Sequence, residues 1–241
     1  MGFFNKLFRN SSTTPPQPPD FPFPLVTVRG REAEAALAEL QAQGKDQGFC
    51  PVLLGGDSDV QRITDFGSYV EQDVEELLAR AKDIDPKAWF EDIRKQDPDY
   101  YASELGEWPK RDRPVSGLTT HRKVLSGLCK PWVHIVQVPT EKSWEVPCYL
   151  KLGDWNDCPA PPVHTALAKY WRDKYGAEIV GSTGETIEFT VESPPDTREA
   201  AEALAMEHFL YCPDAVHQGA ESIRNLGAMV IGASVWTFWW D

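Results

Sequence analysis

The chain has 241 residues, of which 41% are hydrophobic and 25% are charged, and its formal net charge is -13 at pH 7. These proportions are typical of a globular protein with a buried core, so they exclude a wholly disordered chain. A surface this acidic repels phosphate backbones, which excludes general nucleic-acid binding and favours a basic protein as partner.

The N-terminal stretch MGFFNKLFRN is amphipathic, with large apolar residues beside Lys6 and Arg9. Residues 10–22 are rich in Ser, Thr and Pro, so residues 1–22 are predicted to be a flexible start and linker. No apolar run approaches the length that spans a bilayer, and no secretory signal is recognisable. We therefore expect a cytoplasmic protein without stable membrane insertion, and contact of the amphipathic start with a membrane stays open.

Residues 23–140 are predicted to form an N-terminal α/β region. FPLVTVRG has the composition of a strand, REAEAALAELQAQG has the pattern of a helix ending at Gly44, and PVLLGG is a short apolar strand. A strand, a helix and a strand in this spacing predict a βαβ-like beginning.

The segment from Tyr69 to about Leu105 has a helical pattern broken near Pro86. Twelve acidic and five basic residues between Glu71 and Glu107 give a local net charge of -7. This acidic face is either a solvated helix surface or a docking surface for a basic partner. Its first carboxylates are the candidate contact residues: Glu71, Asp73, Glu75 and Glu76.

A Pro-rich basic stretch, WPKRDRPVSG, predicts a domain boundary or a long crossing loop. PWVHIVQVP and VPCYLKLGDW are then two apolar runs that predict neighbouring strands. His134 lies inside the first run, where a core or hydrogen-bonded histidine is favoured over a catalytic one.

Residues 141–241 are predicted to form a separate C-terminal module. After the strand at PCYLKLG come a helix at 161–176, two strands within 177–195, two helices within 197–233 and a strand at SVWTFWWD. Apart from the extra helix, this order is that of a ferredoxin-like split βαβ module, so the predicted class is α+β with the N-terminal region packed against it. In SVWTFWWD both faces are apolar, which predicts a buried strand inside a larger sheet or under the N-terminal region.

The run VPCYLKLGDWNDCPAPPVHTALAKYWRDKYGAEIVGSTGETIEFTV, followed by TREAAEALAMEHFLYCPDAVHQG and VWTFWWD, closely resembles a bacterial family known as domain of unknown function 4253. The resemblance covers about residues 145–241. It implies a bacterial origin and a shared fold, and it implies no reaction.

Two segments of this region hold side chains that suit hydrogen bonding to a ligand or a peptide. GDWNDCP precedes the helix that carries His164, and FLYCPDAVHQG ends the next long helix. Structural roles are the alternative: helix caps for the Asn and Asp, buried small side chains for the cysteines, and a backbone hydrogen bond for the tyrosine. The candidate residues are Asp154, Trp155, Asn156, Asp157, Cys158, His164, Tyr211, Cys212, Asp214 and His217.

The chain contains no GxSxG, GxxxxGK[ST], GxGxxG or HExxH motif. Its five cysteines lack metal-site spacing, so we predict reduced thiols, no metal and no cofactor. The predicted function is a non-enzymatic acidic protein-binding factor of the inhibitor or immunity type. The alternatives are a small-ligand sensor that uses a cleft at Trp155 and Tyr211, or a thiol enzyme with Cys158 as nucleophile, His164 as base and Asp214 orienting it. The oligomeric state stays open.

Overall fold

The computed structural model describes residues 15–241, and the predicted amphipathic start, residues 1–14, lies outside them. Helices and a mixed six-stranded sheet give an α+β protein. Within the described residues, no helix is both long and apolar enough to cross a membrane.

The sheet has the strand order β1-β3-β2-β4-β5-β6, so β1 and β6 are its two edges. All neighbours are antiparallel except β2 and β4, which run parallel. The strands are β1 Leu25–Arg29, β2 Cys50–Gly55, β3 Trp132–Val138, β4 Ala177–Ser182, β5 Thr186–Val191 and β6 Val235–Trp239.

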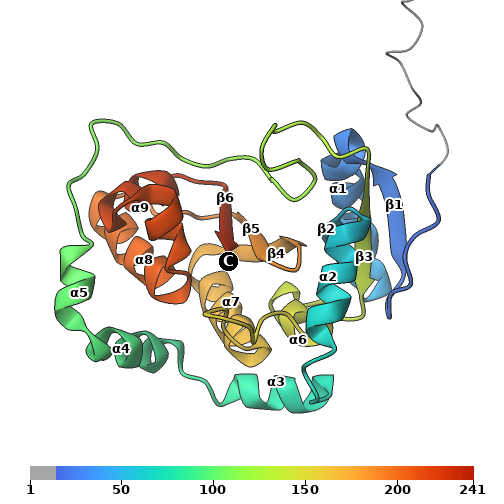
Figure 1. Ribbon diagram of the computed structural model, residues 1–241, viewed down its shortest axis with the longest axis horizontal. Coiled ribbons are helices and arrows are strands. Elements are labelled where there is room, and N and C mark those ends of the chain that lie inside the picture. Colours follow the sequence, from blue (N-terminus) through green and yellow to red (C-terminus); the bar gives the residue numbers. More distant parts are fainter. Residues whose placement is uncertain (1–14) are drawn as a thin grey trace, which may run out of the picture.

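Helices cover the sheet and extend past the β6 edge. In Figure 1, α8 and α9 lie beside β6, while α3 to α5 follow the border of the molecule. The helices are α1 Ala33–Gln47, α2 Asp57–Gly67, α3 Val74–Lys82, α4 Pro86–Gln96, α5 Pro98–Ser103, α6 Val146–Leu150, α7 Pro161–Tyr175, α8 Arg198–Tyr211 and α9 Ile223–Val230, with a π-helix at Ala215–Ala220.

The predicted βαβ beginning is confirmed. Because β3 is antiparallel to both β1 and β2, these two strands run parallel on either side of it, with α1 as their connection. The helix end was predicted at Gly44, which is wrong: α1 continues to Gln47, and Gly48 (φ 75°) is its left-handed cap. A side chain at Gly44 would collide with the backbone of Phe49, which explains a glycine inside the helix.

The strand predicted at residues 146–155 is instead the short helix α6. Pro147 stands in its first turn, where the missing N–H costs nothing, and Lys151 closes it with φ 51°. Val146, Pro147, Cys148 and Leu150 are all buried, and the strand was predicted because a short apolar run fits a buried strand and a buried helix equally well.

The ferredoxin-like module is not confirmed. Strands β4, β5 and β6 are consecutive antiparallel neighbours, and β4 joins the rest of the sheet through β2. A split βαβ unit is present at the other end of the sheet, where it consists of β1, α1 and β2 with β3 between the two strands. Strands from both sides of the predicted boundary at residues 140 and 141 belong to one sheet. The division into two modules at that boundary stays a prediction.

The aromatic strand β6 is buried, as predicted, but it lies at a sheet edge rather than inside. Trp236, Phe238 and Trp240 pack on the face covered by α7 and α8, where the Trp171 ring stacks on Phe238 at 5.6 Å. Val235 packs on the opposite face with residues of α1 and the connection from α5 to β3. Of the two predicted positions, inside a larger sheet is wrong, whereas packing under the N-terminal region holds for the face of β6 that carries Val235.

The basic stretch from residue 108 to 131 is a long crossing connection (Figure 1). It is fixed to β5 by Glu188, whose buried carboxylate accepts hydrogen bonds from the backbone N–H and hydroxyl of both Thr119 and Thr120 at 2.6–3.1 Å. Four donors on one buried carboxylate compensate its desolvation and hold this connection over the sheet.

Candidate functional site

Residues 153–158 form a tight loop before α7. Gly153 (φ 93°), Asp154 (φ 67°) and Asn156 (φ 45°) all have left-handed backbones. A side chain at Gly153 would collide with the Pro159 carbonyl and the His164 ring, so only glycine fits there. The loop thereby brings Cys158 against His164.

Cys158, His164 and Tyr211 form a buried chain of polar contacts. The Cys158 Sγ lies 3.5 Å from Nε2 of His164, and Nδ1 of that histidine is hydrogen-bonded to the Tyr211 hydroxyl at 2.6 Å. Trp240 packs against both the His164 and the Tyr211 rings. The sequence alone left the contact between Cys158 and His164 open, and the structure provides it.

Burial keeps this chain neutral. It lowers the pKa of His164 to about 3 and raises the pKa of Tyr211 well above its usual value. The pKa of the Cys158 thiol is also raised, by burial first and then by Cys212 and Asp154. A nucleophilic cysteine needs its pKa lowered, so the pKa shifts of this pair do not favour a thiolate at pH 7.

The second predicted segment, FLYCPDAVHQG, contacts the C-terminal end of β6 through other residues. The Cys212 thiol donates to the Trp239 carbonyl at 2.9 Å, and burial raises its pKa to about 12. Asp214 accepts from Gln218 and from the backbone N–H of Asp241, so it does not orient His164 as the thiol-enzyme hypothesis requires. The exposed His217 is hydrogen-bonded to Tyr100 at 2.7 Å.

The remaining loop residues point elsewhere. Asn156 donates to the Asp241 carbonyl at 3.1 Å, and the exposed Asp154 and Asp157 make no hydrogen bond through their side chains within the described chain. Since Ala160 is the N-cap of α7, the capping role considered for Asn156 or Asp157 is wrong. Trp155 packs on Phe66 with ring centroids 5.1 Å apart, and its indole nitrogen is buried without a partner among residues 15–241.

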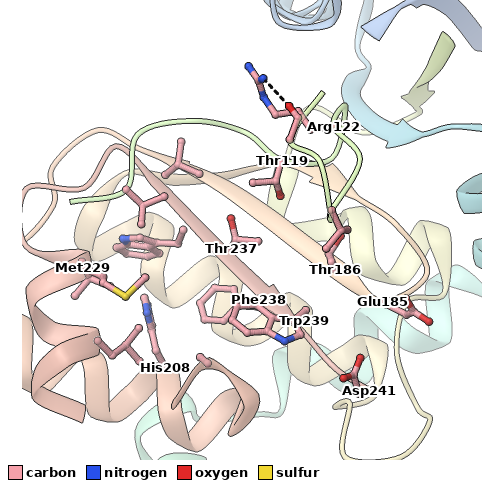
Figure 2. Close-up of a pocket in the computed structure, with 18 of the residues that line it drawn as sticks. Thr119, Arg122, Glu185, Thr186, His208, Met229, Thr237, Phe238, Trp239 and Asp241 are labelled. Carbon is pink, nitrogen blue, oxygen red and sulfur yellow. Dashed lines mark hydrogen bonds between the residues drawn. The ribbon is translucent and has the colours of Figure 1, made fainter. Parts of the chain in front are cut away.

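An apolar groove of about 590 Å³ opens at the free edge of β6. One wall is the connection at residues 115–127, the floor is β6, and the other wall comes from α8 and α9. Figure 2 shows His208 and Met229 rising from the helices toward the strand, with Thr119 and Thr237 on the side of the connection. None of the ten candidate residues lines this groove.

The rim of the groove exposes large apolar side chains. Val124 and Leu125 are fully exposed and Leu128 is 67% exposed, all on the loop that bears Arg122 and Lys123. Exposed apolar patches beside a groove are typical of interaction surfaces. Apart from Tyr69, these are the exposed large hydrophobic residues of the described chain.

Comparison with known families identifies the C-terminal region. Residues 134–241 match the model of a family described as Domain of unknown function (DUF4253). The C-terminal region is similar to this family, and we call residues 134–241 the DUF4253-like region. The expected resemblance is thereby confirmed, and neither curated proteins nor solved structures give a significant match. The floor and one wall of the groove belong to the DUF4253-like region, while residues 115–127 precede it.

The acidic face lies outside the DUF4253-like region, on α3 to α5 and the residues just before α3. Glu71, Asp73, Glu75 and Glu76 are all exposed. Asp73 is also the N-cap of α3, where its carboxylate accepts from the Glu76 N–H at 2.9 Å, and Asp85 and Asp97 cap α4 and α5 in the same way. Part of the acidity therefore has a structural role, which the charge count alone did not indicate.

The groove was missed from the sequence. It is assembled from four segments that are distant in the chain, and its histidine, His208, lies in an ordinary helical pattern. The available signal was the run HRKVLSGL, where apolar residues stand in a basic, Pro-flanked loop without helical or strand periodicity.

Thiol accessibility provides a direct check of the buried cysteines. Burial raises the pKa of Cys50 to about 12 and that of Cys148 to about 11, and Cys158 and Cys212 are buried as well. We expect the half-buried Cys129 to react first with a thiol reagent at pH 7 and all five cysteines to react after denaturation without reductant. Elemental analysis should find no stoichiometric zinc. Bound zinc, or fewer than five thiols, would contradict the prediction of free cysteines.

Proposed function

We propose that this protein is a non-enzymatic protein-binding factor of the inhibitor or immunity type, acting in the bacterial cytoplasm. The observation that carries the proposal is the groove at the β6 edge with its exposed apolar rim. Neighbouring exposed apolar side chains such as Val124, Leu125 and Leu128 are typical of a surface that a partner covers.

The alternatives have less support. The thiol enzyme requires an ionisable Cys158, and burial raises the pKa of this thiol while His164 stays neutral. A small-ligand sensor could use the groove, whose volume suits a small molecule. However, the side chain of Leu125 is fully exposed, so a ligand held inside the groove would leave it in water.

A basic protein is the second candidate partner, bound at the acidic face. The observation that favours it is the exposure of Glu71, Glu75 and Glu76, which form no salt bridge within the described residues. Steering by these carboxylates would speed association and would weaken with added salt, because charge interactions are screened beyond about 10 Å at 0.1 M salt.

Paired variants test both surfaces on the partner captured from the native host. Leu125→Ser should weaken its affinity about 10- to 100-fold, as expected for losing one buried leucine, while the adjacent Ser126→Ala should leave it unchanged. The reversal Glu71→Lys with Glu75→Lys and Glu76→Lys should slow association if the acidic face is used. Asp73 stays unchanged because it caps α3.

The dissociation constants and association rates can be measured by surface plasmon resonance at two salt concentrations. Equal affinity of wild type, Leu125→Ser and the reversal variant would show that neither surface binds the partner. The proposed function would then be wrong in both of its forms.

A further inference from the structure

The outer edge of β6 has unused backbone hydrogen-bonding groups. Ser234 accepts from Val191 and Trp240 donates to Glu185, both on the β5 side. Because the direction alternates along an antiparallel strand, the N–H and C=O groups of Val235, Thr237 and Trp239 point away from β5. The Trp239 carbonyl is taken by the Cys212 thiol, but no hydrogen bond from residues 15–241 reaches the outward groups of Val235 and Thr237.

These backbone groups lie on the floor of the groove. Val235 and Thr237 both line it, together with Met229 from α9 and Val115 from the opposite wall. A bare strand edge normally invites pairing with another strand, and proteins block such edges unless pairing is useful. Here the walls flank the edge of β6, where Val235 is buried and Thr237 is half-buried between them (Figure 2).

We propose that the groove binds an extended, acidic and apolar segment of a partner protein, which adds to the sheet as a strand beside β6. This inference rests on the proposed protein-binding function and specifies its partner. Backbone hydrogen bonds to Val235 and Thr237 would supply affinity, and alternate apolar side chains would contact the two walls.

The charges at the rim select the acidic character of the segment. Arg122 and Lys123 line the groove and form no salt bridge within the described residues, although Arg122 donates to the Gly127 carbonyl. Two acids, Glu185 and Asp241, also line the groove, and Glu185 is ion-paired with Arg62. Between Trp108 and Pro131 there are six Lys or Arg residues and one acid, in a chain whose net charge is -13. This local reversal of charge beside the groove favours a carboxylate on the bound segment.

Two other occupants fit less well. A second copy would have to bring its own β6 edge to this one, and that edge lies between the same two walls, residues 115–127 and α9. The chain's own N-terminal segment, residues 1–14, contains Lys6 and Arg9 and no acid, so it does not complement Arg122 and Lys123. A single extended strand from a partner enters the groove without either difficulty.

The sharpest test removes one outward N–H. Thr237→Pro deletes this donor but leaves the β5 ladder intact, because the N–H faces away from β5, and proline is tolerated in edge strands at such positions. Thr237→Val is the matched control, since both variants lose the Thr237 hydroxyl while valine keeps the backbone donor. Circular dichroism and thermal unfolding establish that both variants are folded.

The probe is a displayed library of random linear ten-residue peptides, selected on the wild-type protein. We expect enriched peptides to alternate apolar residues and to carry Asp or Glu. The most enriched peptide should bind Thr237→Pro about tenfold more weakly than Thr237→Val, and N-methylation of its backbone at alternate residues should abolish binding. Hydrogen exchange should show new protection of the Thr237 amide in the complex.

Absence of enrichment, or equal binding to Thr237→Pro and Thr237→Val, would overturn strand addition. If the captured partner is then still weakened by Leu125→Ser, the protein-binding function stands and only the mode of binding is wrong. A dimer of the wild-type protein that Thr237→Pro converts to a monomer in sedimentation would instead assign the β6 edge to a second copy and overturn the proposal.

Discussion

Trp240→Ala should lower the free energy of unfolding by about 3 to 5 kcal/mol, the usual cost of truncating a large buried aromatic side chain. Trp240 is 2% exposed and packs edge-on against the His164 and Tyr211 rings. Its removal leaves a cavity beside the Cys158–His164–Tyr211 chain, so loss of soluble expression is an expected form of the result. Urea unfolding followed by fluorescence measures the change.

Trp239→Ala is the control on the same strand. Trp239 is half-buried and lines the groove on the other side of the strand from Trp240, so its truncation should cost clearly less stability. If Trp240→Ala were fully stable and had lost a binding partner, the aromatic residues of β6 would be an exposed interface rather than core.

Acidification from pH 6.5 to about pH 5 should destabilise the protein by about 3 to 4 kcal/mol through two buried histidines. Burial lowers the pKa of both His164 and His208 to about 3. In the unfolded chain both take up protons near pH 6.5, whereas the folded protein keeps them neutral. The unfolded state thus binds more protons, and stability falls as the pH decreases, by about 1.4 kcal/mol per pH unit for each histidine.

The measurement is urea unfolding at several pH values between 7 and 5. His208→Gln should reduce the slope of stability against pH by about a third to a half, whatever its effect on stability at pH 7, because His164 still titrates and so does His121, whose pKa is also lowered by burial. An unchanged slope in His208→Gln would show that His208 does not contribute to the pH dependence of stability. His217→Gln, at an exposed position, serves as the control for a histidine substitution.

Local patterns predicted local elements well. Helix α7 has the predicted helical spacing and ends at Gly176 (φ 61°), and α8 begins after Thr197, which caps it as expected. Helix α6 was predicted as a strand because a short apolar run does not distinguish the two structures, and Pro147 was the overlooked signal. The position of β6 at an edge depends on which strands pair over long distances, and no local pattern encodes that.

The candidate site, too, could be predicted only in part from local sequence patterns. The residue types around Cys158 and His164 suggested chemistry, but burial decides their protonation, and burial depends on packing by β6 and α8. Asp214 was grouped with them by sequence proximity to Tyr211, yet its contacts are with Gln218 and Asp241. The groove joins residues more than one hundred positions apart, so it could be found only once the fold was known.

Because β2 lies between β3 and β4, it determines which fragments of this protein can keep an intact sheet. Residues 134–241, the part that matches the family, include most of β3 but neither β1 nor β2, its two neighbours in the sheet. A fragment that begins at residue 134 would leave β3 without hydrogen-bonded partners. It would also expose the edge of β4 that pairs with β2. In this protein the boundary of the shared sequence is not a boundary at which the sheet can be divided, and any family member that lacks the preceding strands must complete its sheet by other means.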